Sequence, residues 1–338
     1  MSTNKKNIST IIILICIISV IIGIFLPKER NTSELSSHNG SCFNKRNISL
    51  CTPFKTEKIS VIKLEGIISD SSGNSILRDA TSSNQVLELI VKATNDPTVK
   101  GIVIRVNSPG GTVAASQEIY QAILKARKRK PVVITMGDIA ASGGYYIASA
   151  ADTIFANPGT LTGSIGVITS YFNFYDLLNK IGVKGVTIKS GKYKDIGNPT
   201  RPLTEEEKKI LQALLDNSYK QFINDVSKGR KMSKEKVASL AKGLIYTGEQ
   251  ANKAGLVDHL GDYSKALKHT QKLVKERFPE LARKYGKNDI PVEESWKTSS
   301  IIDVLINSSS RFTNPNTIEN KMLKTYSYSK FQPLWLLE

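Results

Sequence analysis

Histidine is scarce in this chain of 338 residues, which contains only His38, His259 and His269. None of the three follows a glycine-rich strand end, where an α/β hydrolase places its catalytic groups. A Ser–His–Asp triad is therefore disfavoured. The sequence also lacks an H-E-x-x-H motif and a Cys/His cluster, which argues against a zinc mechanism. We predict an activity that needs no metal and no cofactor.

Cysteine is equally rare, with three residues in the chain. Cys16 lies in an apolar run, whereas Cys42 and Cys51 lie in a polar stretch rich in serine and asparagine. Outside the cytoplasm, two cysteines this close can form a local disulfide. Two free thiols in a flexible stalk remain the alternative.

Acidic residues are outnumbered, with 30 Asp and Glu against 47 Lys and Arg, so the net charge is +17. The basic residues are spread along the chain, and no nucleic-acid motif accompanies them. We therefore expect no nucleic-acid partner. A bias toward an anionic membrane surface fits the N-terminus better.

The N-terminus contains the one long apolar run, residues 9–26, preceded by Lys5 and Lys6. Its length is close to the roughly 20 residues that span a bilayer as a helix. No small-x-small cleavage site follows, because the run ends in Leu26-Pro27-Lys28. We predict a cytoplasmic segment 1–8, a transmembrane signal anchor 9–26 and a polar stalk 27–57, with the rest of the chain outside the cytoplasm.

From residue 58 onward, strand-like and helix-like patterns alternate, with glycine-bearing turns between them. This alternation predicts an α/β fold with crossover connections and parallel pairing. Expected strands are 59–64, 101–106, 132–136, 153–156 and 185–189; expected helices are 83–94, 114–128, 142–150, 204–228, 234–241, 248–254 and 263–276. Beyond Pro279 the sequence is polar and irregular until an apolar end.

Three short segments stand out as candidates for chemistry. Asn107-Ser108-Pro109-Gly110-Gly111 follows an expected strand, and its paired glycines allow backbone N–H groups to face a ligand as an oxyanion site requires. A plain Pro-Gly turn is the alternative.

In the second segment, Ser142 is flanked by alanine and glycine between an expected strand and helix. The arrangement is similar to a nucleophile elbow, although Ala140 occupies the first glycine position of that motif. The alternative is a serine that caps the following helix.

The third segment is Ser190-Gly191-Lys192-Tyr193-Lys194-Asp195. Lysines in a loop are usually solvated charges. With histidine disfavoured, however, a lysine is the most plausible base, provided that its pKa falls from about 10.4 toward about 7–8.

Together these segments resemble signal peptide peptidase A, the short bacterial form of the S49 serine peptidases. The resemblance runs from about residue 59 to 260 and depends on the joint occurrence of several segments: Arg105–Gly111, Ala140–Tyr146, Leu161–Val167 and Gly191–Asp195.

The resemblance implies roles for particular residues. Ser142 matches the nucleophile, and Lys194, rather than Lys192, matches the general base. The amides of Gly111 and Gly143 match the oxyanion hole. Supporting roles would fall to Thr162 and Ser164, for which a tight turn packed against the nucleophile helix is an equal alternative.

The resemblance also implies a ClpP/crotonase-like fold of stacked ββα units over residues 58–278. It implies a Ser–Lys endopeptidase that degrades remnant signal peptides and other hydrophobic peptides. The protein would be a single-pass protein of the bacterial inner membrane, anchored in lipid by its N-terminal helix and assembled as a dome-shaped homo-oligomer, with serine and lysine contributed by neighbouring subunits.

Two rival functions and one segment remain open. A crotonase-like acyl-CoA enzyme would share the fold and the oxyanion glycines, and a catalytically silent membrane scaffold would share the fold alone. The tail 279–338 is longer than the resemblance accounts for, and its last residues, Phe331 to Glu338, are like a hydrophobic peptide substrate. We expect this tail to be either flexible or a cap on the chain's own binding groove.

Overall fold

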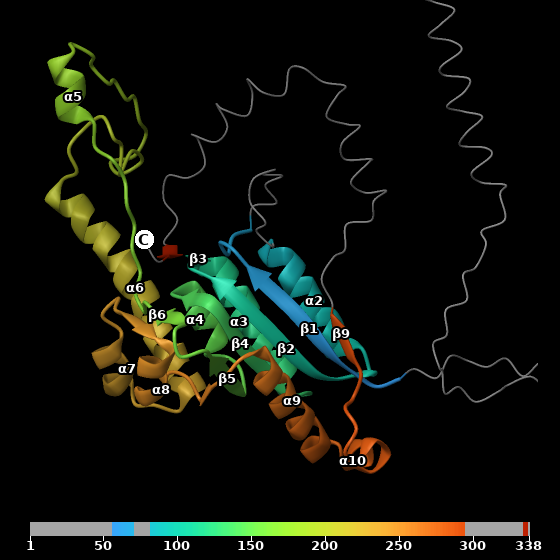
Figure 1. Cartoon of the computed structure of the whole chain (residues 1–338). Helices are drawn as coiled ribbons and strands as arrows, with labels where there is room; N and C mark the ends of the chain where they lie inside the picture. The colour runs from blue at the N-terminus through green and yellow to red at the C-terminus, as the bar shows by residue number, and fades with distance from the viewer. Residues whose placement is uncertain (1–55, 71–81, 295–333, 337–338) are drawn as a thin grey trace, which may run out of the picture. The chain divides into compact units, whose positions relative to one another are not determined.

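A computed structural model describes residues 56–70, 82–294 and 334–336 (Figure 1). The chain divides into Met1–Pro53 and Phe54–Glu338, and the account below concerns the second unit. The expected signal anchor, His38, Cys42 and Cys51 lie outside the described ranges. Within those ranges, no helix is both long enough and apolar enough to cross a membrane.

Strands and helices alternate through the described chain. The strands are β1 Lys58–Glu65, β2 Val99–Ser108, β3 Gly110–Thr112, β4 Val132–Ala141, β5 Thr153–Ala156, β6 Leu161–Gly163, β7 Ile245–Thr247, β8 His259–Leu260, β9 Val292–Glu294 and β10 Leu334–Leu336. The helices are α2 Ser83–Asn95, α3 Val113–Arg127, α4 Gly143–Ala148, α5 Tyr175–Lys180, α6 Glu205–Arg230, α7 Lys234–Leu240, α8 Gly248–Lys253, α9 Tyr263–Arg277 and α10 Pro279–Tyr285.

The main sheet runs in the order β7-β6-β4-β2-β1-β9, and β5 and β8 extend it from β4. Its pairs are parallel except β6 with β7, so the sheet is mixed rather than purely parallel. The expected α/β class with parallel crossovers is confirmed. Strand β4 has two neighbours on one side: its first half pairs with β5 and its second half pairs with β6.

Helices cover both faces of the central strands, which explains why those strands are almost continuously apolar. On β2, Ile102 and Ile104 pack in the cluster that includes residues of α2 and α3. The intervening Val103 faces the other way and packs with Val274 of α9. Side chains alternate along a strand, so each strand contributes to two cores at once.

Most of the expected elements occur within a residue or two of their predicted bounds, but the strand expected at 185–189 does not form. Val186 is 85% exposed and Ile188 is 98% exposed, and neither belongs to a strand of either sheet. A β-branched run needs a neighbouring strand, and no strand of the described part of the chain pairs with this one.

The chain is also more regular beyond Pro279 than its composition indicates. Helix α10 begins at Pro279, where proline suits the first turn, and β9 then pairs with β1 through Ile59 and Val292. The irregular region expected after Pro279 therefore contains ordered structure up to Glu294.

Helix α6 shows how a local signal sets an element boundary. The Thr204 hydroxyl accepts a hydrogen bond from the Glu207 N–H, and the Glu207 carboxylate accepts one from the Thr204 N–H. The sequence carries the signal for this capping box, a threonine followed three residues later by a glutamate. Further along α6, Phe222 is fully buried and packs edge-on against Tyr146 of α4 at a centroid distance of 5.1 Å.

Replacing Phe222 by alanine should lower the free energy of unfolding by about 3–5 kcal/mol, because it leaves a cavity beneath α4. Leu214→Ala on the same helix is the matched control, since Leu214 is 56% exposed and should cost less than about 0.5 kcal/mol. Denaturant unfolding followed by circular dichroism measures both. Equal losses in the two variants would contradict the packing assigned to α6.

Candidate active site

Ser142 lies between the end of β4 and the start of α4, in a backbone conformation that L-amino acids avoid. Its φ is 51° and its ψ is −115°. The conformation is held by the Ser142 N–H, which donates to the Gly163 carbonyl at 2.8 Å, and by the Ser142 carbonyl, which accepts from the Tyr146 N–H at 2.8 Å. Such strain costs about 1–3 kcal/mol and is concentrated at functional sites.

The Ser142 hydroxyl is buried without a hydrogen-bond partner. The residue is 1% exposed, and its Oγ is the one buried side-chain polar atom without a partner among the described residues. Ser142 occupies the N-cap position of α4, but its side chain makes no cap hydrogen bond. The Ser142 side chain therefore does not cap α4, which excludes the helix-capping alternative. Its oxygen is available for chemistry.

The glycines expected to donate to an oxyanion lie side by side next to Ser142. A Cβ on Gly143 would come within 3.1 Å of the Gly111 nitrogen, and a Cβ on Gly111 would come within 1.8 Å of the Ile68 carbonyl oxygen. Neither position has room for a side chain. The carboxyl ends of neighbouring parallel strands bring the two loops together, since Ser108 of β2 is paired with Ala140 of β4.

The peptide groups of β3 have two different partners. The Gly110 carbonyl accepts from the Ile68 N–H at 2.9 Å, and the Thr112 N–H donates to the Ile68 carbonyl at 2.8 Å. Because backbone groups alternate along a strand, the Gly111 N–H and C=O face the opposite side. On that side lies β10, which pairs antiparallel with β3 through Trp335 and Gly111 (Figure 1).

Two buried tyrosines anchor α4 behind the serine. The Tyr145 hydroxyl donates to the Leu256 carbonyl at 3.0 Å, and the Tyr146 hydroxyl donates to Asp225 Oδ2 at 2.6 Å. Burial raises the pKa of both phenols, and the neighbouring Asp225 carboxylate adds to the rise for Tyr146. Both therefore remain neutral hydrogen-bond donors that fix the helix.

The two residues expected in supporting roles lie on and just after β6. The Thr162 hydroxyl donates to the Ala140 carbonyl at 2.6 Å and so ties β6 to the strand that carries Ser142. Ser164 has a φ of 47°, and its N–H donates to the Leu244 carbonyl at 2.7 Å. These contacts form a tight turn beside β4; a direct role for either hydroxyl stays a prediction.

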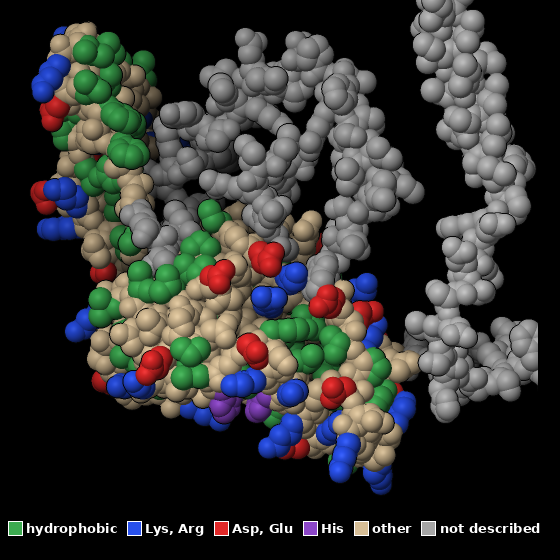
Figure 2. Space-filling view, viewed as in Figure 1, with side chains coloured by type: hydrophobic (Ala, Val, Ile, Leu, Met, Phe, Trp, Pro, Cys, Tyr) green, Lys and Arg blue, Asp and Glu red, His purple; other side chains and the backbone are tan. Residues whose placement is uncertain are grey.

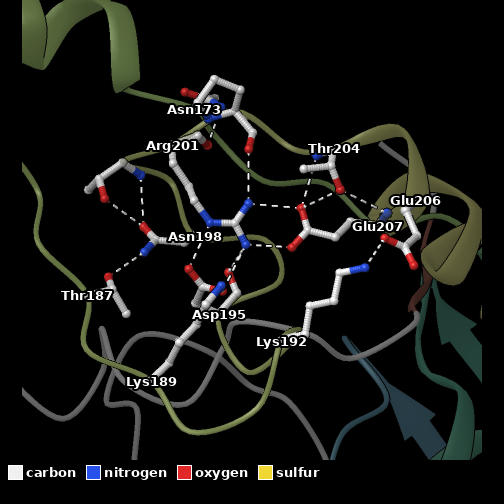
Figure 3. Close-up of polar contacts among 12 residues, drawn as sticks. Asn173, Thr187, Lys189, Lys192, Asp195, Asn198, Arg201, Thr204, Glu206 and Glu207 are labelled. Carbon is white, nitrogen blue, oxygen red and sulfur yellow. Dashed lines mark hydrogen bonds and ion pairs between the residues drawn. The ribbon is translucent and has the colours of Figure 1, made fainter.

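Lys194 lies on the long connection between β6 and α6, which carries α5 away from the sheet in Figure 1. Lys194 is exposed, and its ammonium group makes no hydrogen bond or ion pair with any described residue. Lys192, by contrast, pairs with Glu206 at 2.5 Å (Figure 3). The single chain thus places the expected base and the expected nucleophile on separate elements, without a bond between them.

The same connection exposes many large apolar side chains, and Figure 2 shows hydrophobic atoms gathered along it. The most exposed of them are Phe172 at 79%, Leu177 at 56%, Ile181 at 63%, Val186 at 85% and Ile188 at 98%. An exposed apolar surface of this kind marks an interaction site.

The two described histidines pack together elsewhere in the fold, as Figure 2 shows. The His259 and His269 rings are 5.3 Å apart, and both contact Phe155. Burial lowers the pKa of His269, and the neighbouring His259 lowers it further. Neither of these two rings makes a hydrogen bond to Ser142; that histidine is not the base stays a prediction.

Sequence patterns missed two parts of this region. One is the ion-pair network of Arg201 with Asp195 and Glu207, drawn in Figure 3. The only local hint is the capping box that contains Glu207. The other is the pairing of β10 with β3, which joins residues far apart in the sequence and has no local signal beyond the apolar character of the chain end.

Comparisons with known proteins agree with this geometry. A profile of peptidase family S49 matches residues 125–277, and one of Clp protease matches residues 67–160. A putative protease of Synechocystis is 44% identical over 212 residues, which cover 62% of this chain and 73% of the relative. A putative signal peptide peptidase SppA of Enterococcus faecium is 37% identical over 249 residues, covering 73% of this chain and 72% of the relative.

Longer relatives match as well. Protease 4 of Haemophilus influenzae is 37% identical over 221 residues, which make up 65% of this chain but 35% of that protein. Fold, site and relatives together define a serine-type peptidase. The chain belongs to peptidase family S49.

Ser142→Gly should be more stable than Ser142→Ala by about 1 kcal/mol. Glycine adopts a φ of 51° without the strain, and this gain exceeds the roughly 0.5–1 kcal/mol entropy cost of glycine. Both variants lack the unpaired hydroxyl, so their difference isolates the backbone. Denaturant unfolding measures it; a glycine variant no more stable than the alanine variant would contradict the strain assigned to Ser142.

Proposed function

We propose that this protein is a membrane-anchored endopeptidase with a Ser–Lys dyad, in which Ser142 is the nucleophile and Lys194 the general base. Its proposed substrates are remnant signal peptides and other hydrophobic peptides. The observation that carries the proposal is a strained, buried serine with an unpartnered hydroxyl beside two glycine amides, at an edge where an extended strand is already paired.

The reaction divides into two acyl transfers. The neutral Lys194 amine takes the proton from Ser142 Oγ as that oxygen attacks the peptide carbonyl carbon. The amides of Gly111 and Gly143 donate to the resulting oxyanion, and removing one such donor typically costs about 2.7–4 kcal/mol. Collapse breaks the C–N bond, and Lys194 passes the proton to the leaving amine. Lys194 then takes a proton from water as the water oxygen attacks the ester carbonyl carbon. The bond between that carbon and Ser142 Oγ breaks, Lys194 returns the proton to Ser142 Oγ, and the carboxylic acid product leaves.

The geometry of β3 and β10 supports a mode of peptide binding. A substrate strand that runs antiparallel to Gly110–Thr112 would meet the outward N–H and C=O of Gly111. Backbone pairing of this kind gives affinity for extended chains with little dependence on side chains. Such binding suits an enzyme that degrades apolar segments of varied sequence.

We further propose that the dyad forms between subunits of a homo-oligomer. Lys194 is exposed and unpaired in the described chain, and the segment that carries it exposes an apolar surface. A second copy that buries this surface would receive Lys194 near its own Ser142. A head-to-tail contact of this type repeats from copy to copy and forms a ring when the rotation between copies closes. A monomer would then be inactive.

For location, we propose a single-pass protein of the bacterial inner membrane with its catalytic domain on the extracytoplasmic side. Support comes from the apolar run 9–26 and the lysines before it. An anchored enzyme would be held beside membrane-embedded peptides.

The tail is proposed to compete with substrate for the groove. Residues Leu334–Leu336 occupy the edge of β3 that a substrate strand would use. A tethered competitor acts at a high effective concentration even if its intrinsic affinity is modest. Substrate binding would therefore require displacement of β10.

Full-length protein in detergent should hydrolyse a fluorogenic hydrophobic peptide, and Ser142→Ala or Lys194→Ala should abolish turnover. Lys192→Ala is the matched control on the same loop and should keep most of the activity, because its ammonium pairs with Glu206. Folding is checked by circular dichroism. Turnover by Ser142→Ala would exclude the dyad, and thioester turnover that persists in this variant would favour a crotonase-like enzyme.

Mixing Ser142→Ala and Lys194→Ala chains, unfolded together and refolded, should restore activity, because each supplies what the other lacks. At random 1:1 assembly about one site in four pairs an intact serine with an intact neighbouring lysine, so about a quarter of wild-type activity is expected. Each variant refolded alone is the control. A mixture as inactive as its components would contradict a shared site.

Deletion of residues 334–338 should lower the apparent KM about three- to tenfold with little change in kcat, because a tethered competitor has been removed. A synthetic peptide of residues 331–338, added to the truncated enzyme, should inhibit competitively, and a scrambled peptide of equal composition should not. An unchanged KM in the truncated enzyme would show that β10 does not restrict the groove.

A further inference from the structure

We infer that Arg201 is a positioning residue that holds Asp195 away from Lys194 and so leaves the lysine free to act as a base. This inference rests on the proposed Ser–Lys function. It concerns a side chain that touches neither substrate nor Ser142, and it follows from the polar network in Figure 3.

Asp195 directly follows Lys194, yet its carboxylate is occupied by other partners. Arg201 Nε donates to Asp195 Oδ2 at 2.8 Å, and Arg201 Nη2 donates to Oδ1 at 2.9 Å. Lys189 Nζ donates to Oδ1 as well. The Asp195 side chain is 9% exposed, so both oxygens are engaged in a largely enclosed site.

The same guanidinium reaches the first turn of α6. Arg201 Nη1 donates to Glu207 Oε2 at 2.9 Å, and Nη2 donates to Oε1 at 2.5 Å. Glu207 is fixed in turn by Thr204 through the capping box. Arg201 therefore joins the loop that carries Lys194 to a rigid helix through two fork-shaped contacts, a geometry that lysine cannot reproduce.

The charges in this network balance. Arg201 and Lys189 carry two positive charges, and Asp195 and Glu207 carry two negative charges. Hydrogen bonds from Arg201 and then Lys189 hold the pKa of Asp195 well below its usual range, and Arg201 lowers the pKa of Glu207 to about 2. Both carboxylates thus stay ionised and paired with positive charges through the working pH range.

Other charged and titratable groups near Lys194 also have hydrogen-bond partners of their own. Lys192 and Tyr193 both donate to Glu206, at the exposed start of α6. Lys194, unlike its neighbours Lys189 and Lys192, has no carboxylate partner among the described residues. An ammonium held by a carboxylate stays protonated to higher pH and cannot accept a proton from serine.

Loss of Arg201 would release Asp195 as a partner for the adjacent lysine. In Arg201→Gln, the ionisation that governs kcat/KM should move upward by about one pH unit, which corresponds to about tenfold lower activity at neutral pH. The probe is the fluorogenic hydrophobic peptide, and the rates are measured from pH 6 to 10 on the full-length protein in detergent.

The double variant Asp195→Asn/Arg201→Gln separates charge from structure. If Arg201 acts by sequestering the carboxylate, the amide cannot capture Lys194, and the pH profile should return close to that of the wild type. If Arg201 only braces the loop, the double variant should be as impaired as the single one, and the inference is wrong. A wild-type profile in Arg201→Gln itself would also overturn it.

Two further variants complete the test. Lys208→Gln removes one positive charge from an exposed pair with Glu205 on α6 and should leave the profile unchanged. Lys189→Gln removes a single donor to Asp195 and should shift the pH profile in the same direction as Arg201→Gln but by less. If Arg201→Gln does not fold, Lys189→Gln takes its place as the test. An unshifted pH profile in Lys189→Gln would then overturn the inference. Activity in Lys194→Ala would instead refute the dyad, so the two failures are distinguishable.

Discussion

The parallel pairing of β2 with β4 is the constraint on which the site depends. It places the carboxyl ends of two strands side by side, so the turn after β2 and the turn after β4 must share one small volume. Only glycine fits where they meet, at Gly111 and Gly143. The same crowding holds Ser142 in its strained conformation and leaves its hydroxyl buried without a partner. Packing energy from α4, anchored by Tyr145 and Tyr146, offsets that strain.

A second constraint separates the serine from its proposed base. The loop that carries Lys194 is tied to α6 through Arg201, not to the sheet that carries Ser142. Its apolar side chains are exposed in one chain. A catalytic pair divided in this way would link activity to assembly. Since β10 lies on the edge proposed for substrate, the groove of a folded chain would already hold a peptide strand.

Local sequence patterns were sufficient to predict the helices and strands that are stabilised by local contacts or that are buried on both faces. The apolar run of β2 and the Thr204–Glu207 capping box are examples, because each depends on residues that are close together in the sequence. The apolar run at 185–189 misled, because strand formation depends on a neighbour that the sequence pattern cannot supply. Helix α10 and strand β9 were missed for the complementary reason: their polar sequence is ordered by contact with α9 and β1.

The sequence by itself determined the class of fold and the candidate residues. Glycine spacing, the position of Ser142 after a strand and the scarcity of histidine are properties of residue type and order, and they limit the chemistry before folding. The tertiary structure decided which of these residues meet. Distances between residues remote in the chain depend on strand pairing and helix packing, so only the folded chain could bring Gly111 to Gly143 and pair β10 with β3.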